Sequence, residues 1–145
     1  MTQTRTAFVN GATAGIGEAT VRTLVANGWR CVATGRRQER LDALVADLGA
    51  DKVHPACFDV RDAAAMDAEI AALPEDFAGI DLLVNNAGLA QGLSPAQESN
   101  LDDWQTMIDT NVTAMVVLTR KLLPVLIERK GAIIPGPPVT KRRNV

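Results

Sequence analysis

The chain has 145 residues, 47% of them hydrophobic and 22% charged, which is the ordinary composition of one soluble globular domain. Its formal net charge of −2 argues against a nucleic-acid partner and against an anionic membrane surface. No apolar run approaches the length of a membrane span, and the first five residues lack the apolar region of a signal peptide, so we expect a cytoplasmic protein.

The first predicted element is a short strand that ends in a glycine-rich turn and leads into a helix. In this turn Gly11 would let the chain reverse, Gly15 would let a pyrophosphate approach the backbone, and Gly17 would let the helix lie close to the sheet. The free N–H groups of the first helical turn would then face the phosphates. Taken alone, an ordinary glycine-rich turn is the alternative. The predicted phosphate-binding residues are Gly11, Ala12, Thr13, Ala14, Gly15, Ile16 and Gly17.

Strands and helices alternate along the residues that follow. The pattern first predicts a helix that ends at Asn27-Gly28, a strand over 30–34 and a helix over 38–48. It then predicts a strand within 53–60 that ends at Asp59, and a helix through Met66, Ile70 and Leu73 that Pro74 stops. A strand over 80–85 follows. The strands read as continuous apolar runs. This pattern predicts an α/β fold, a Rossmann-like doubly wound parallel sheet with helices on both faces.

A long helical region is predicted from about residue 101 to residue 130. Between residues 112 and 127 its apolar residues cover more than half of the circumference. One face of a sheet cannot bury all of them, so we expect a second copy of this helix to pack there and to make a homo-oligomer. We expect Pro124 to kink the helix.

The pattern breaks soon after the start of a fifth strand at residues 131–134. The run Pro135-Gly136-Pro137-Pro138 cannot continue a central strand, because proline lacks the N–H group that the sheet needs. We therefore expect one region over 1–134 and an irregular basic tail over 135–145, as in a frameshifted or truncated sequence, so that the sheet stops after about five strands.

The cysteines and the histidine give no sign of a metal or redox site. Cys31, His54 and Cys57 each lie in a strand-like run, without the Cys-x-x-Cys or Cys/His spacing of such sites. We expect both thiols to be free and buried, no bound metal, and no catalytic role for His54.

Two arginines, Arg36 and Arg37, follow the second predicted strand. In a dinucleotide-binding fold, a carboxylate at this place bonds the 2′-OH of NAD, whereas arginine accommodates the 2′-phosphate of NADP. Cations are unfavourable at the start of a helix unless an anion is present, so these two favour NADP(H) over the alternative of a charged helix start.

Five motifs resemble, in their order, the landmarks of the short-chain dehydrogenase/reductase family: Asn10 to Gly17, Gly35-Arg36-Arg37, Asp59-Val60, Asn85-Asn86-Ala87-Gly88 and Asn111. The runs over 34–41 and 103–111 are similar to its NADP-dependent 3-hydroxy acid (serine/threonine-type) dehydrogenase branch. The resemblance covers residues 5 to 134.

The resemblance implies a role for each motif in binding a nicotinamide dinucleotide. The glycine-rich turn would hold the pyrophosphate, and the two arginines would hold the 2′-phosphate. The remaining residues implied are Asp59 and Val60 at the adenine, Asn86, Ala87 and Gly88 at the ribose and nicotinamide, Asn85 as a brace between strands, and Asn111, which would position a water of a proton relay. A core asparagine at the helix kink is the alternative for Asn111.

The same resemblance also implies residues that the chain lacks. The family moves a proton with a serine, a tyrosine and a lysine, all after the fifth strand, while the nicotinamide moves a hydride. The 145 residues include no tyrosine, and the two serines, Ser94 and Ser99, precede the long helix. We expect an NADP-binding fragment of an oxidoreductase without turnover of its own. A non-catalytic NADP-binding or interaction module is the alternative, and a chain that barely folds is a third possibility.

Overall fold

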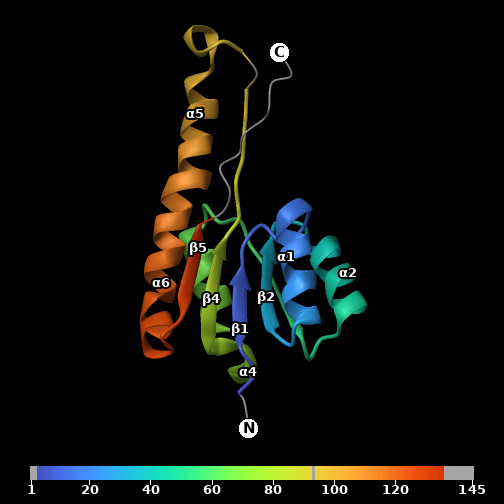
Figure 1. The fold of residues 1–145 in the computed structure, drawn as a ribbon. Helices are drawn as coiled ribbons and strands as arrows, with labels where there is room; N and C mark the ends of the chain where they lie inside the picture. The colour runs from blue at the N-terminus through green and yellow to red at the C-terminus, as the bar shows by residue number, and fades with distance from the viewer. Residues whose placement is uncertain (1–2, 93, 136–145) are drawn as a thin grey trace.

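The computed structural model of the chain describes residues 3–92 and 94–135, so all of the predicted tail except Pro135 lies outside the described residues. The described part forms a parallel sheet with the strand order β3-β2-β1-β4-β5 (Figure 1). The strands are β1 (Thr6–Val9), β2 (Arg30–Gly35), β3 (Val53–Cys57), β4 (Ile80–Asn85) and β5 (Ala132–Pro135). Each neighbouring pair runs parallel, which confirms the predicted Rossmann-like sheet.

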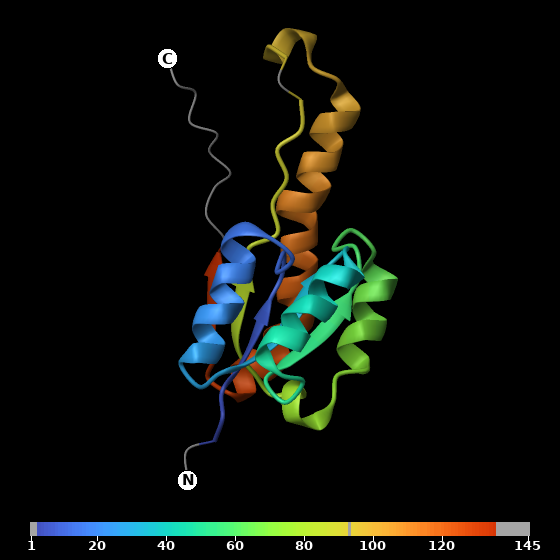
Figure 2. The ribbon, with the colours of Figure 1, turned by 90° about the vertical axis from the view of Figure 1, so that its right-hand side faces the viewer.

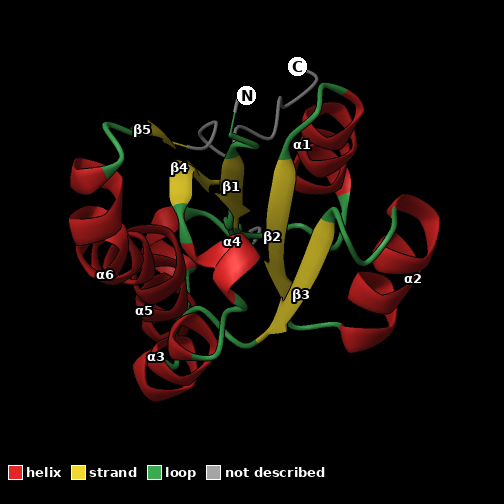
Figure 3. Cartoon of the chain, turned by 90° about the horizontal axis from the view of Figure 1, so that it is seen from below, coloured by secondary structure: helices red, strands yellow, loops and turns green. Residues whose placement is uncertain are grey.

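Helices cover both faces of the sheet, as Figures 2 and 3 show. On one face lie α1 (Gly15–Ala26) and α2 (Gln38–Leu48), which bury Val21, Leu41 and Leu44 against the strands. The opposite face is covered by α3 (Ala63–Ala71), α4 (Glu75–Ala78) and α6 (Ala114–Glu128). Neighbouring residues of β1 point to opposite faces, so the central strand contributes to both halves of the core.

The helices α1 and α2 end at the glycines that the sequence predicts. Gly28 has a φ of +83° and Gly49 a φ of +102°, a backbone region that glycine adopts at little cost. Helical geometry in α1 begins at Gly15, so the last glycine of the turn, Gly17, lies within the first turn of the helix.

Two predicted boundaries between Val53 and Ile80 are wrong. The strand β3 ends at Cys57 and not at Asp59, because Asp59 begins a turn: its Oδ1 atom accepts from the Arg61 N–H at 2.9 Å. Helix α3 ends at Ala71, before the predicted stop at Pro74, and a short helix over Glu75–Ala78 follows that the pattern does not predict.

The long helical region is not one continuous α-helix. It consists of α5 (Leu101–Ile108), a stretch of π-helix over Asp109–Thr113 and then α6, and a short 3₁₀ turn, Ala96–Glu98, precedes it. The π-helical stretch was not predicted from the sequence; such stretches occur often at functional sites. Pro124 lies inside α6, which continues past it as α-helix.

The statement that no apolar run approaches a membrane span is wrong for this region. The helix over Leu101–Glu128 has 28 residues and is long and apolar enough to cross a membrane by length and composition alone. Its second half forms one layer of the α/β fold, because Leu118, Leu122 and Leu126 are buried against the sheet. Contact with the sheet therefore explains part of the apolar character of this helix, and no membrane is needed for that part.

The edge strand β5 extends one residue further than predicted and includes Pro135. In the register of the sheet Pro135 lies opposite Asn85 of β4. An edge position tolerates proline, because the missing N–H would not be needed by a second neighbour. The side chains of Ile133 and Ile134 are exposed in this strand.

The two cysteines differ in burial. Cys31 has no exposed surface, and burial raises the pKa of its thiol to about 12. Cys57, at the end of β3, is only half-buried, which corrects the expectation that both thiols are buried. Both are free, as predicted.

Candidate cofactor-binding cleft

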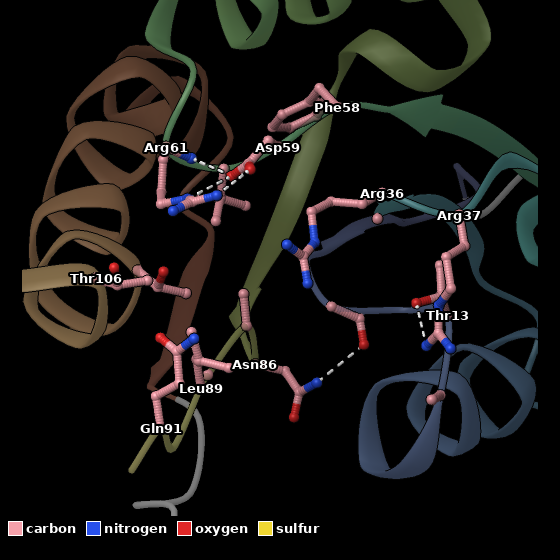
Figure 4. Close-up of a pocket in the computed structure, with 17 residues that line it drawn as sticks. Thr13, Arg36, Arg37, Phe58, Asp59, Arg61, Asn86, Leu89, Gln91 and Thr106 are labelled. Atoms are coloured by element: carbon pink, nitrogen blue, oxygen red, sulfur yellow. Dashed lines mark hydrogen bonds and ion pairs between the residues drawn. The ribbon is translucent and has the colours of Figure 1, made fainter. Parts of the chain in front are cut away.

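A cleft of about 530 Å³ opens at the carboxyl ends of the strands (Figure 4). Its walls come from the turns after β1, β2, β3 and β4 and from α5 and the π-helical stretch. From β1 the chain proceeds to β2 on one side, whereas β4 and β5 lie on the other side. Open α/β sheets bind ligands at such a switch point, and the volume is in the range of small-molecule sites.

The turn after β1 leaves room for a ligand at the start of α1. Gly15 has a φ of +58°, and a Cβ atom added there would meet nothing within 4 Å. The residue before the helix, Ala14, has no side-chain oxygen that could cap it. The first N–H groups of α1 are therefore available to an anion, and the helix dipole favours negative charge at this end.

Gly17 lets α1 approach the turn much more closely than any other residue would. A Cβ atom at Gly17 would lie 2.0 Å from the carbonyl oxygen of Gly11 and 2.6 Å from Nδ2 of Asn86. A Cβ atom at Gly35, after β2, would likewise lie 2.3 Å from Cγ2 of Thr13. Both glycines thus permit close contacts within the cleft wall, and the sequence reasoning gave Gly35 no role of its own.

A network of amides joins the turns after β1 and β4. The Nδ2 group of Asn10 donates to Oδ1 of Asn85 at 3.2 Å, and Oδ1 of Asn10 accepts from the Ala87 N–H at 2.5 Å. Asn85 in turn donates to Oγ1 of Thr119 on α6 at 3.1 Å, and Asn86 donates to the Gly11 carbonyl at 3.2 Å. Asn85 thus braces the strands as the resemblance implies, whereas the contribution of Asn10 was not predicted.

The two arginines after β2 lie at the same end of the cleft as the turn after β1. Nη2 of Arg37 donates to Oγ1 of Thr13 at 3.0 Å, and the side chain of Arg36 extends toward the middle of the cleft (Figure 4). Both side chains are exposed. They place two positive charges beside the start of α1.

Beyond β3, Asp59 and Arg61 form an ion pair on the cleft wall. Nε of Arg61 donates to Oδ1 of Asp59 at 3.2 Å and Nη2 donates to Oδ2 at 2.8 Å. The hydrogen bond from the Arg61 side chain is the largest of the causes that lower the pKa of Asp59. Sequence reasoning missed Arg61, although its spacing of two residues from an aspartate at a turn is a usable signal.

Asn111 lies on the π-helical stretch and holds the segment after β4. Its Oδ1 atom accepts from the Leu89 N–H at 2.7 Å, and its Nδ2 group donates to the Leu89 carbonyl at 2.8 Å. Asn111 is not among the cleft-lining residues, whereas Leu89 is. The role of Asn111 in a proton relay stays a prediction.

The cleft brings together most of the residues singled out in the sequence. Those that line it are Gly11, Thr13, Ala14, Arg36, Arg37, Asp59, Val60, Asn86, Ala87 and Gly88. Ala12 and Gly17 are buried behind it, Gly15 begins α1 beside it, and the side chain of Ile16 is 61% exposed. Seven more lining residues were not among the predicted site residues: Gly35, Phe58, Arg61, Leu89, Gln91, Thr106 and Thr110.

Fold and cleft together define a Rossmann-like α/β protein with a nucleotide-type cleft at the switch point of its sheet. A profile described as short chain dehydrogenase matches residues 5–135, and the chain belongs to this family. It is 50% identical over 129 residues to the serine 3-dehydrogenase of Agrobacterium fabrum. It is also 50% identical over 128 residues to the NADP-dependent 3-hydroxy acid dehydrogenase YdfG of Escherichia coli K12.

These alignments include 89% and 88% of this chain, and the chain spans about half, 51%, of the length of each relative. Among solved structures, serine dehydrogenase from Escherichia coli superposes with a TM-score of 0.84 at 47% identity, covering 88% of this chain and 59% of that one. The closed form of serine dehydrogenase complexed with NADP⁺ gives a TM-score of 0.85 at 48% identity, with 88% and 52% coverage.

Proposed function

We propose that the chain binds NADP(H) in this cleft and forms the cofactor-binding part of a short-chain oxidoreductase. The observation that carries the proposal is that two features meet at one end of the cleft. The open start of α1 suits a pyrophosphate, and Arg36 and Arg37 suit an additional phosphate. The names of relatives at 50% identity, which include NADP dependence, support this assignment.

The residues present suit the parts of this cofactor. The turn over 11–17 would hold the pyrophosphate, and the arginine pair would hold the 2′-phosphate. At the adenine end, Asp59 would accept a hydrogen bond from the amino group and Val60 would pack on the ring. The segment over 86–88 would border the ribose and the nicotinamide. When bound, the cofactor would supply the hydride that this family exchanges with a substrate carbon.

The proposed family reaction is the oxidation of a 3-hydroxy acid or a similar alcohol, or the reverse reduction. Hydride transfer at carbon requires a matching proton transfer at the substrate oxygen. None of the 145 residues is a tyrosine, and both serines precede α5. We infer that this chain binds the cofactor but does not turn over a substrate by itself. A non-catalytic NADP-binding module is the second candidate, and it is supported by the same absence of a tyrosine from the 145 residues.

Thermal unfolding with and without nucleotide tests the binding proposal. A ligand that binds only the native state raises the free energy of unfolding of the protein, by about 2.7 kcal/mol when the ligand concentration is a hundred times Kd. We expect NADPH to raise the unfolding midpoint, and NADH at the same concentration to raise it less. Equal shifts, or no shift for a chain that unfolds cooperatively, would contradict the proposal. Steady oxidation of serine with NADP⁺ by the purified chain would contradict the inference that it has no turnover.

We further propose that a second copy of the chain packs against the long helix. Its exposed apolar side chains are spaced at helical intervals and cover most of its length: Leu101, Trp104, Ile108, Val112, Val116, Leu123 and Ile127. Val116, for example, is 57% exposed. The face of α6 that packs against the sheet is a different one. Such a stripe is typical of an interface between protein chains.

We expect light scattering to give a dimer for the wild-type chain and a monomer for Val116→Glu, because a carboxylate in an apolar interface loses its hydration. The matched control is Ala46→Glu, which adds the same charge at an exposed site on α2, on the opposite face of the sheet. A wild-type monomer, or dissociation by both variants, would refute this interface.

A further inference from the structure

Arg61 holds the Asp59 carboxylate in a fixed orientation on the cleft wall (Figure 4). Oδ1 of Asp59 accepts from the backbone N–H of Arg61 at 2.9 Å and from its Nε at 3.2 Å. Oδ2 accepts from Nη2 at 2.8 Å. Each carboxylate oxygen offers about two acceptor positions, so these contacts fill Oδ1 and leave one position on Oδ2.

The pairing also removes an electrostatic obstacle in the cleft. An anionic ligand with a pyrophosphate would be repelled by an isolated carboxylate, and the Arg61 guanidinium offsets that charge. The side chains are 40% and 31% exposed, so this ion pair contributes little to the stability of the fold.

We propose that Arg61 is a positioning residue that makes this cleft selective for a 6-aminopurine over a 6-oxopurine. The inference rests on the proposed binding of NADP(H) and adds a specificity determinant to it. With Oδ1 occupied, Asp59 presents Oδ2 to the base. An amino group at position 6 donates to this oxygen, whereas a carbonyl oxygen at position 6 meets a negative charge.

Two nucleotides test the proposal: NADPH and its hypoxanthine analogue, the reduced nicotinamide hypoxanthine dinucleotide phosphate, whose base has an oxygen in place of the 6-amino group and a proton on the adjacent N1. We expect the wild-type chain to bind NADPH about tenfold more tightly than the analogue. In Arg61→Ala the carboxylate keeps only its backbone contact, and the preference is expected to fall to about twofold or less. The variant's unfolding midpoint should stay within a few degrees of wild type.

Two further variants separate positioning from charge. Arg61→Lys keeps the positive charge but cannot form the two parallel hydrogen bonds, so we expect it to lose the preference as Arg61→Ala does. Arg22→Ala removes an arginine of α1 that bridges Glu18 and Asp47 and does not line the cleft. That control should keep the preference of the wild type.

The outcomes distinguish this inference from the function on which it rests. A wild-type chain that binds neither nucleotide removes both the proposed function and the inference. Binding of NADPH with the preference unchanged in Arg61→Ala overturns the inference alone. An equal loss of affinity for both nucleotides also overturns it, because that result assigns Arg61 to charge compensation and not to recognition of the base.

Discussion

The Gly17→Ala variant is expected to lose NADPH binding and to unfold at a much lower temperature than the wild-type chain. The added Cβ atom would lie 2.0 Å from the Gly11 carbonyl oxygen and 2.6 Å from Nδ2 of Asn86. Neither a backbone carbonyl nor an anchored amide moves away cheaply, so the start of α1 must shift from the turn. Overpacking of this kind costs about 1–3 kcal/mol, and occasionally more.

Two other glycines separate the effect on binding from the effect on the fold. Gly15 and Gly28 both have positive φ angles, +58° and +83°, and a Cβ atom at either would meet nothing within 4 Å. Alanine should therefore cost a similar strain, about 1–2 kcal/mol, at both positions. Only Gly15 adjoins the cleft, so Gly15→Ala should weaken NADPH binding and Gly28→Ala should not.

The measurement is a nucleotide titration of the three variants, followed by nucleotide fluorescence, together with thermal unfolding monitored by circular dichroism. If Gly15→Ala and Gly28→Ala bind NADPH equally well, the start of α1 is not the phosphate site. If Gly17→Ala binds and unfolds like the wild type, the close contact with Gly11 does not support the turn.

The second large effect is expected for the arginines after β2. Arg36→Ala combined with Arg37→Ala should lower the affinity for NADPH about a hundredfold and leave the affinity for NADH nearly unchanged. Each charge-assisted hydrogen bond to the 2′-phosphate is worth about 1.5–3 kcal/mol, and NADH has no phosphate there. Arg37 also donates to Oγ1 of Thr13 at 3.0 Å, and if this contact supported the turn, its loss would lower the affinity for NADH as well.

Calorimetric titration with both nucleotides measures this change. The matched control is Arg40→Ala, which removes an exposed arginine of α2 outside the cleft and should preserve the selectivity for NADPH. If the double variant loses affinity for NADH and NADPH alike, the two side chains support the turn and do not read the 2′-phosphate. An unchanged NADPH affinity would place the phosphate elsewhere.

Local patterns in the sequence were enough to predict most of the secondary structure and the parallel sheet. The bounds of α2 and β4 agree with the prediction, because each is an uninterrupted periodic or apolar run that ends at a glycine or a polar residue. The end of β3 was misplaced, because the turn at Asp59 depends on a hydrogen bond to its own side chain. The π-helical stretch over Asp109–Thr113 has no signature in hydrophobic spacing.

The cleft was only partly predictable for a related reason. Glycines and charged residues that directly follow strands can be located from spacing, and this is how the turn after β1 and the arginine pair were found. The hydrogen bond from the Ala87 N–H to Oδ1 of Asn10 joins residues 77 positions apart in the sequence. The hydrogen bond from the Leu89 N–H to Oδ1 of Asn111 joins residues 22 positions apart. Such contacts exist only after the sheet has formed, so the sequence gives no direct sign of them.

The hydrogen-bond network of Asn10, Asn85 and Ala87 determines how late in synthesis the cleft can form. Asn10 emerges early in synthesis, but its partners are Asn85 and Ala87, and Asn85 is anchored in turn to Thr119. We therefore expect the cleft of a growing polypeptide to be held in place only after α6 has left the ribosome and docked on the sheet. Affinity for the nucleotide should therefore arise in a single late step, and a chain released before residue 119 should carry the glycine-rich turn after β1 yet capture no nucleotide.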